Sequence, residues 1–224
     1  MQISSIVKLS ASLSALALCT VAQSASLIVN GSFETNTAVT TVFNPSNGQF
    51  NSFMNGVTAY GAREGIDIQT FGSGFGQTPQ NGSWKISPAS DANGAAEEFS
   101  MTLIGQMVVG ASYDLSFYVE RLANGQFNGG SVQIGVSTSA TSFGTQVAAA
   151  TAPNGGWLLS TTTFFAPLPA SYLTVRVTNT QSSWVGLDNF TLTGPVAAVP
   201  EPATTALLLA GLAVIGFASA RRRH

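Results

Sequence analysis

The sequence predicts an all-β protein, an antiparallel β-sandwich with a secretion signal before it and a hydrophobic segment after it. Short segments with apolar residues at alternate positions recur along the chain, separated by Gly- and Asn-rich turns. No segment of useful length shows the 3.6-residue apolar period of an amphipathic helix. The 23 glycines and the 8% of charged residues are typical of exported β-rich surface proteins.

The first 24 residues have the organisation of a secretory signal peptide. Lys8 precedes an apolar run at residues 9–21, and the small residues Ala22 and Ser24 predict cleavage after Ser24. Cys19 is the only cysteine, and the large Leu18 before it excludes a lipoprotein signal. The mature chain therefore has no disulfide to stabilise it.

The segment expected to fold, residues 25–195, is long enough for one domain with a sizeable core. Removing Lys8 and Arg221 to Arg223 from the eight basic residues leaves four, and removing Glu201 from the ten acidic residues leaves nine. The mature domain thus carries a net charge near −5. This charge argues against nucleic acid as a partner, because binding to phosphates needs a basic face.

Strands are predicted in order along this domain, the first at residues 27–29 before the Asn30-Gly31 turn. Residues 44–56 and 72–82 are polar and Gly-rich and are predicted to be loops. The clearest alternation lies at residues 113–120. Further strands are expected at residues 99–109, 132–136, 158–165, 173–177 and 184–192. One shared core is predicted to contain Leu115, Phe117, Val132, Ile134, Phe164, Val175 and Leu187.

Several segments, in order, resemble the galactose-binding-like jelly roll used by many carbohydrate-binding modules. They are the opening 27–34, the strand 113–117 preceded by Gln106 and Gly110, the segment 162–167 preceded by Trp157, and the closing pair 173–177 and 185–192. The resemblance implies a jelly-roll topology and leaves residues 37–91 without a counterpart.

The C-terminal residues 196–224 have three parts. Val199, Pro200, Glu201 and Pro202 precede an uncharged apolar run at 203–220, and Arg221, Arg222 and Arg223 follow it. The run is at the lower limit for a transmembrane helix, and the arginines are expected on the cytoplasmic side. These parts resemble the PEP-CTERM sorting signal, which in its family is recognised by exosortase, a membrane protease-transpeptidase. The resemblance implies export across the inner membrane, a transient membrane anchor, and then a place on the cell surface or in the extracellular matrix. The alternative is an ordinary anchor that stays in place.

The domain lacks the residues of most hydrolytic sites. The only histidine is His224, in the tail, which excludes Ser-His-Asp and Cys-His catalysis and histidine-ligated zinc. Neighbouring residues of a strand point to opposite faces, so Glu97 and Glu98 cannot flank one glycosidic bond. We expect these two to be a solvated strand entrance, and we expect no enzyme activity.

A structural calcium ion is a possible cofactor, since calcium takes oxygen ligands. In the resembled family such an ion often joins the start of the domain to its last strand, which implies Glu34 and Asp188 as ligands here. The alternative is that Glu34 caps a turn and Asp188 bonds to nearby amides.

An exposed aromatic ring could bind the C–H face of a sugar. Trp84 follows a polar loop, and with Tyr60 and Asn81 it is the candidate ligand site, whereas Trp157 is expected in the core. The sequence thus predicts a non-catalytic structural or adhesive module of the cell envelope or matrix. The alternative is an exopolysaccharide-binding module, and a glycoside-acting enzyme is the weakest reading.

Overall fold

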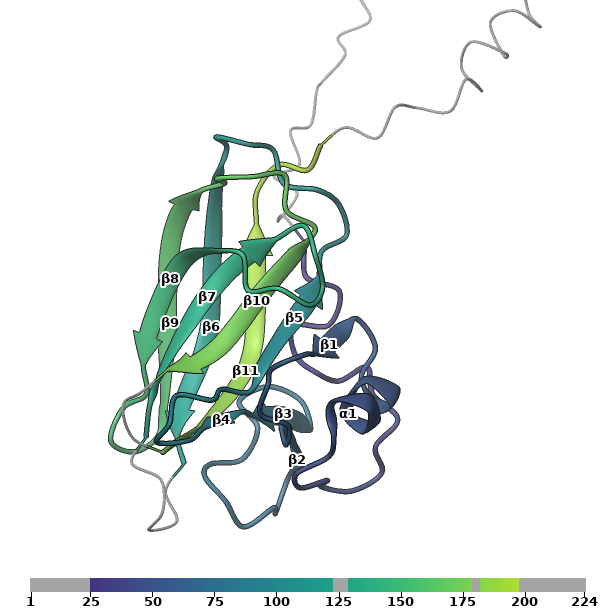
Figure 1. Ribbon diagram of the computed structural model, residues 1–224, viewed down its shortest axis with the longest axis vertical. Helices are drawn as coiled ribbons and strands as arrows, with labels where there is room; N and C mark the ends of the chain where they lie inside the picture. The colour runs from purple at the N-terminus through teal and green to yellow at the C-terminus, as the bar shows by residue number, and fades with distance from the viewer. Residues whose placement is uncertain (1–24, 123–128, 179–181, 198–224) are drawn as a thin grey trace, which may run out of the picture.

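The computed structural model describes residues 25–122, 129–178 and 182–197, which form two antiparallel sheets packed face to face (Figure 1). One sheet has five strands in the order β1-β5-β10-β7-β8. Their bounds are β1 Val57–Ala59, β5 Glu98–Thr102, β10 Tyr172–Thr178, β7 Ser131–Ser137 and β8 Thr145–Thr151. Every pairing within this sheet is antiparallel.

The second sheet has six strands, in the order β2-β3-β11-β6-β9, with the short β4 paired beside β11. Their bounds are β2 Asp67–Thr70, β3 Trp84–Ser87, β11 Ser183–Thr193, β6 Ser112–Arg121, β9 Trp157–Phe165 and β4 Ala89–Ser90. The pairings are again antiparallel. The prediction of an all-β antiparallel sandwich is confirmed.

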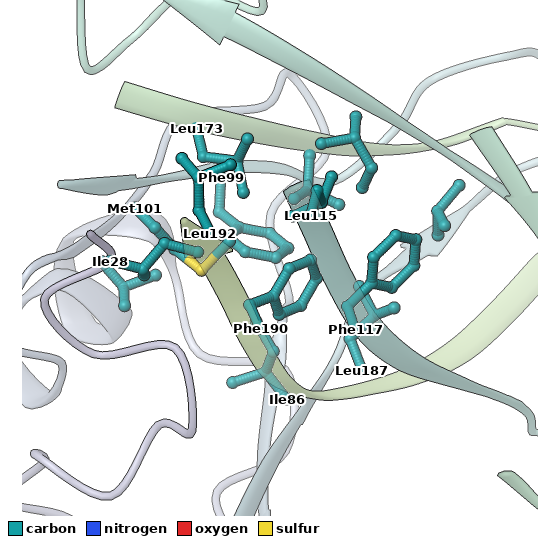
Figure 2. Packing of buried hydrophobic residues seen from close by; sticks show 14 of the residues in the cluster. Ile28, Ile86, Phe99, Met101, Leu115, Phe117, Leu173, Leu187, Phe190 and Leu192 are labelled. Carbon is teal, nitrogen blue, oxygen red and sulfur yellow. The ribbon is translucent and has the colours of Figure 1, made fainter. Parts of the chain in front are cut away.

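One hydrophobic core fills the space between the sheets (Figure 2). All seven residues predicted for it are buried in this cluster. Phe117 of β6 stacks on Phe190 of β11 with ring centroids 4.9 Å apart, and Phe33 packs edge-on against Phe190 at 6.1 Å. Because the alternation fixes which face of each strand is apolar, it also fixes which side chains meet between the sheets.

The N-terminal segment ties the two sheets together. Leu27 N donates to Leu192 O of β11 at 2.7 Å, and Ile104 N, just after β5, donates to Leu27 O at 2.8 Å. The strand predicted at 27–29 is wrong, because the chain forms one isolated bridge, Ile28 with Leu103, and then turns. The described residues build a large core, and the first segment closes on the last strand, so we expect residues 25–197 to fold by themselves.

A helix interrupts the segment that was predicted to be a loop at 44–56. α1 spans Asn47–Phe53 and begins with a capping box, in which Ser46 and Gln49 bond to each other's backbone N–H groups. Phe50 is fully buried, and the Asn51 side chain bonds to both backbone groups of Ala59 in β1. The loop prediction failed because two turns of helix with a single buried residue leave no apolar period to detect.

Other elements differ in length from their predictions. The strand expected at 99–109 ends at Thr102, and Ile104 beyond it is exposed. Sequence reasoning missed β1, β2, β3 and β4, which have four residues or fewer, and also β8, whose Ala-rich sequence has low strand propensity.

Several predictions concern residues outside the described ranges. These are the signal peptide at 1–24, the sorting signal after Ala197 and the membrane span at 203–220. Among the residues that the structure describes, no helix is both long and apolar enough to cross a membrane.

Candidate functional site

The main candidate site is a pocket of about 260 Å³ at the end of the sandwich where β2 begins and β4 lies. We call it the aromatic pocket. Three aromatic and three charged side chains line it: Phe43, Phe75, Trp184, Arg63, Asp67 and Glu97. They come from the loop before α1, the segment after β1, the loop before β3, the residue before β5, and the first residues of β2 and β11. Loops carried by a rigid scaffold are the usual place for such a site.

Glu97 forms the buried acidic wall of the aromatic pocket. Its carboxylate accepts hydrogen bonds from Arg63 Nε at 3.0 Å and from Ala89 N at 2.7 Å. The side chain is 1% exposed, so the expectation that it is solvated is wrong. It is buried because Glu97 N also donates to Ala89 O, which closes the backbone of β4 over it. Arg63 remains 28% exposed and adds a positive group at the pocket mouth.

Asp67 is the second buried carboxylate. Its Oδ1 accepts a hydrogen bond from Asn44 N at 2.8 Å, where Asn44 has a left-handed backbone with φ of 48°. Gly65 also lines the pocket, with φ of +130°, and a Cβ there would sit 3.0 Å from Glu97 Oε1 and 3.3 Å from Asn44 Oδ1. The left-handed backbone and this close approach to Glu97 favour glycine at position 65.

The aromatic side of the pocket is a row of three rings. Phe43 and Phe75 meet edge-to-face at 5.5 Å, and Phe75 lies tilted against Trp184 at 5.3 Å. Phe43 and Phe75 are 43% and 38% exposed, whereas Trp184 is buried with Ala89 and Leu122 in a small second cluster. The buried ring forms the floor, and the two exposed rings present apolar surface to a ligand.

Both acids of the aromatic pocket hold protons more tightly than ordinary carboxyls. Burial raises the pKa of Asp67 to about 6, against the lowering effect of the Asn44 N–H. Burial likewise raises the pKa of Glu97 to about 7, with Ala89 N–H and Arg63 lowering it and the charge of Asp67 raising it. Near neutral pH the pocket can therefore both donate and accept hydrogen bonds.

The loop at residues 71–83, here called the covering loop, carries Phe75 into the pocket. It crosses the face of the six-stranded sheet that points away from the core, and Lys85 and Glu120 hold it there. Lys85 Nζ donates to Glu120 Oε1 at 2.5 Å and to the carbonyls of Gln77 at 2.7 Å and Phe75 at 3.1 Å. Glu120 Oε2 in turn accepts from Gln77 N at 2.7 Å. This buried ion pair therefore fixes the position of Phe75.

The two predicted calcium ligands bind the same loop. Glu34 Oε1 accepts from Ser83 N and Trp84 N, both at 2.8 Å, and Asp188 Oδ2 accepts from Gln80 N at 2.8 Å and Asn81 N at 3.0 Å. Burial raises the pKa of Asp188 to about 7, and the charge of Glu34 adds to the increase. The structure thus brings Glu34 and Asp188 near each other. Within the described ranges, no three His, Cys, Asp or Glu residues form a metal-binding group.

The predicted ligand residues lie outside the aromatic pocket. Asn81 is exposed on the covering loop, and Trp84 opens β3 and packs partly against the main core. Tyr60 follows β1 on the other sheet, where Tyr60 N donates to Glu98 O at 2.9 Å. Trp157, which was predicted to lie in the core, is only half-buried and is not part of the core cluster; its Nε1 donates to Thr78 O of the covering loop at 2.9 Å.

Sequence reasoning missed the charged residues that build the site. Between residue 25 and Glu201 there are nine acidic residues, and four of them are buried: Asp67, Glu97, Glu120 and Asp188. Acidic residues are rarely fully buried unless paired. In a chain with so few charges, a charged residue within an apolar segment indicates a buried and paired charge. Lys85 and Glu120 both lie in such segments.

Comparison with protein families identifies the tail. Residues 198–223 match the PEP-CTERM protein-sorting motif, which marks exported, exosortase-processed proteins. The matched range includes positions 199–202 and 221–223. No curated protein matches the chain.

Among solved structures, the chain is similar to β-sandwiches of carbohydrate-binding modules. The CBM22-1 xylan-binding domain of Paenibacillus barcinonensis Xyn10C has 16% identity and a TM-score of 0.44, over 79% of this chain and 100% of that one. A family 16 carbohydrate-binding module has 15% identity and a TM-score of 0.42, over 75% and 99%. The active domain of bacteriophage CBA120 tailspike protein 4 has 14% identity and a TM-score of 0.46, over 76% of this chain but 21% of that one. These similarities concern the sandwich fold.

Proposed function

We propose that this exported, exosortase-sorted protein is a non-catalytic surface or matrix protein whose sandwich binds a carbohydrate in the aromatic pocket. The observation that carries the proposal is the lining of that pocket. Exposed rings of Phe43 and Phe75 stand beside the carboxylates of Asp67 and Glu97. A sugar ring offers the matching surface, with C–H groups on its faces and hydroxyl groups around its edge.

The size of the pocket supports a small ligand. Its volume of about 260 Å³ lies just below the range of about 300 to 1,000 Å³ that holds drug-sized molecules. We infer that the pocket takes one terminal sugar unit of an exopolysaccharide rather than a long stretch of chain.

The bonding of Glu97 supports binding over hydrolysis. Both of its oxygens already accept hydrogen bonds from Arg63 and Ala89, so the group is held in place by the protein. A general acid must instead direct its proton to the leaving oxygen of the substrate. We therefore assign Glu97 and Asp67 to ligand orientation.

Affinity electrophoresis tests this proposal. Residues 25–197 would be run through gels containing xylan, mixed-linkage β-1,3-1,4-glucan, β-1,4-galactan or a bacterial exopolysaccharide. We expect retardation in at least one gel. Replacing Phe75 with alanine should weaken it on the order of tenfold, which corresponds to a loss of about 1.4 kcal/mol.

The matched control is Trp84→Ala, which removes a half-buried ring outside the pocket. It should retain the retardation of the wild type. Loss with Trp84→Ala but not with Phe75→Ala would move the site to the residues predicted from sequence. If the wild type migrates in all four gels as it does in a gel without polysaccharide, carbohydrate binding is contradicted.

A further inference from the structure

The edge strand β9 is a surface that the carbohydrate proposal does not use. It is the last strand of its sheet, and among the described strands it pairs only with β6 (Figure 1). β8 lies at the same side of the sandwich, while α1 and the short strands β1, β2 and β3 lie at the other. Five of the nine side chains of β9 are exposed, among them Leu159 at 47% and Phe165 at 71%.

The usual protections of an edge strand are missing from β9. Proteins blunt such edges with charged side chains, prolines or bulges, because unpaired backbone groups attract further strands. No Asp, Glu, Lys or Arg occurs between Arg121 and Arg176, a stretch that includes the whole of β7, β8 and β9. The pairing of β9 with β6 runs without a register shift from Trp157 to Phe165.

The backbone groups that β9 leaves free can be identified from its ladder. Ala166 N donates to Ala111 O at 3.0 Å, and Leu122 N donates to Trp184 O at 3.1 Å, so even-numbered residues of β6 bond to β11 and its odd-numbered residues bond to β9. The partners of the odd-numbered β6 residues are the even-numbered residues of β9. The odd-numbered residues of β9 therefore point their N–H and C=O groups away from the sheet. These are Trp157, Leu159, Thr161, Thr163 and Phe165.

We propose that two copies of this chain associate by antiparallel pairing of β9 with β9, about a two-fold axis at Thr161. In this register Thr161 faces itself, Leu159 faces Thr163, and Trp157 faces Phe165 of the other copy. Five hydrogen-bonded residue pairs supply about ten main-chain hydrogen bonds. The aromatic pair at each end adds cross-strand packing.

A second copy fits this edge because the edge has no charge. The mature domain carries a net charge near −5, so two copies repel each other over most of their surface. The segment between Arg121 and Arg176 has no charged residue, so two copies can approach each other there without repulsion between like charges. A charged partner would find no counter-charge there, whereas the identical strand matches it in both polarity and register.

The two-fold axis also fixes where the C-terminal ends of the two described chains lie. β9 and β11 run in the same direction, since both are antiparallel to β6, and the described chain ends just after β11 (Figure 1). Pairing reverses β9, so the C-terminal ends of the two copies leave at opposite ends of the dimer. The contact therefore links copies that face each other or that have left the membrane, as the structural or adhesive reading requires.

Sedimentation and charge variants of residues 25–197 test the association. The wild type should show a concentration-dependent dimer. Thr161→Lys and Thr161→Glu should each be monomeric, because like charges would face each other at the axis. Their equimolar mixture should dimerise again. Thr145→Lys, with the same charge placed on β8, should behave as the wild type.

Each other outcome overturns the proposal. A wild type that stays monomeric at millimolar concentration, or a Thr161→Lys variant that still dimerises, excludes the β9 contact. Loss of the dimer in Thr145→Lys but not in Thr161→Lys would place the contact on β8. Should Thr161→Lys fail to fold, Thr161→Pro replaces it, because the N–H that proline lacks points away from β6.

Disulfide cross-linking between cysteine variants tests the register of the β9–β9 pairing. The mature chain has no cysteine, and Cα atoms of a hydrogen-bonded antiparallel pair lie about 5.5 Å apart, within reach of a disulfide. Thr161→Cys should cross-link to itself on oxidation. Thr163→Cys should cross-link to Leu159→Cys and not to itself, and the reverse result would contradict the axis at Thr161. Since none of these residues lines the aromatic pocket, carbohydrate binding should be unchanged in all of them.

Discussion

Replacing Lys85 with methionine should loosen the covering loop and empty one wall of the aromatic pocket. The Lys85 side chain is fully buried, and its ammonium group donates to Glu120, Gln77 and Phe75. Methionine fills much of the space but donates to none of them. Glu120, which is 1% exposed, would keep only Gln77 N as a partner.

Removing one partner of a buried ion pair lowers the free energy of unfolding by about 3 to 5 kcal/mol. For a domain of this size each kcal/mol shifts the melting temperature by about 2 to 4 °C, so the midpoint should fall by about 6 to 20 °C. Burial already raises the pKa of Glu120, and without Lys85 the carboxyl should take up a proton. Because Phe75 O loses the Lys85 donor and keeps only the longer bond from Ser73 Oγ, carbohydrate binding should weaken as well.

Thermal melting and affinity electrophoresis of four proteins measure this effect. They are the wild type, Lys85→Met, Glu120→Gln and the double variant, and the double variant should be less destabilised than the sum of the two single variants. Additive losses, or a Lys85→Met midpoint within about 2 °C of the wild type, would refute the role given to the pair. Full carbohydrate binding by Lys85→Met would show that Phe75 does not depend on it.

Three further predictions concern the core, the pocket acids and calcium. Phe117→Ala removes a fully buried ring that stacks on Phe190, and it should cost about 3 to 5 kcal/mol in chemical denaturation; unchanged stability would contradict the packing. Burial raises the pKa of Glu97 from 4.5 to about 7, so the folded state binds this proton more tightly than the unfolded state. The free energy of unfolding should therefore fall as pH rises from about 4.5 to about 7. The Glu97→Gln variant should show a smaller fall. An equal dependence on pH in the wild type and the variant would exclude Glu97 as its source. If calcium joins Glu34 and Asp188, a hundredfold excess over its dissociation constant should stabilise the domain by about 2.7 kcal/mol relative to a chelator; an equal shift in Glu34→Gln and Asp188→Asn would remove the site.

The sequence predicted the sandwich well because its core strands are long enough to show alternation. Residues 113–120 and 184–192 mark β6 and β11 nearly to their ends. Leu115, Phe117, Leu187 and Leu192 lie in the core as expected, whereas Trp184 belongs to the small second cluster. A strand with one buried face has apolar residues at alternate positions, so it can be recognised from its own sequence alone.

The aromatic pocket could not be predicted in the same way. Phe43, Asp67, Glu97 and Trp184 are far apart in sequence, and loops and strand ends bring them together. Glu97 was predicted to be solvated at a strand entrance, because the neighbouring sequence does not show that Arg63 and Ala89 bond to its carboxylate. Trp84 was predicted as a ligand residue from its neighbouring polar loop, yet that loop is bonded down by Glu34 and Asp188.

Amide chemical-shift mapping tests the central claim most directly. Isotope-labelled residues 25–197 would be titrated with oligosaccharides released from the polysaccharide that retards the domain most strongly in affinity electrophoresis. We predict saturable shifts at Phe43, Asn44, Gly65, Phe75 and Glu97 and at the indole N–H of Trp184, which together surround the pocket. Shifts confined to Tyr60, Asn81 and Trp84, or none at any concentration, would contradict the assignment of carbohydrate binding to the aromatic pocket.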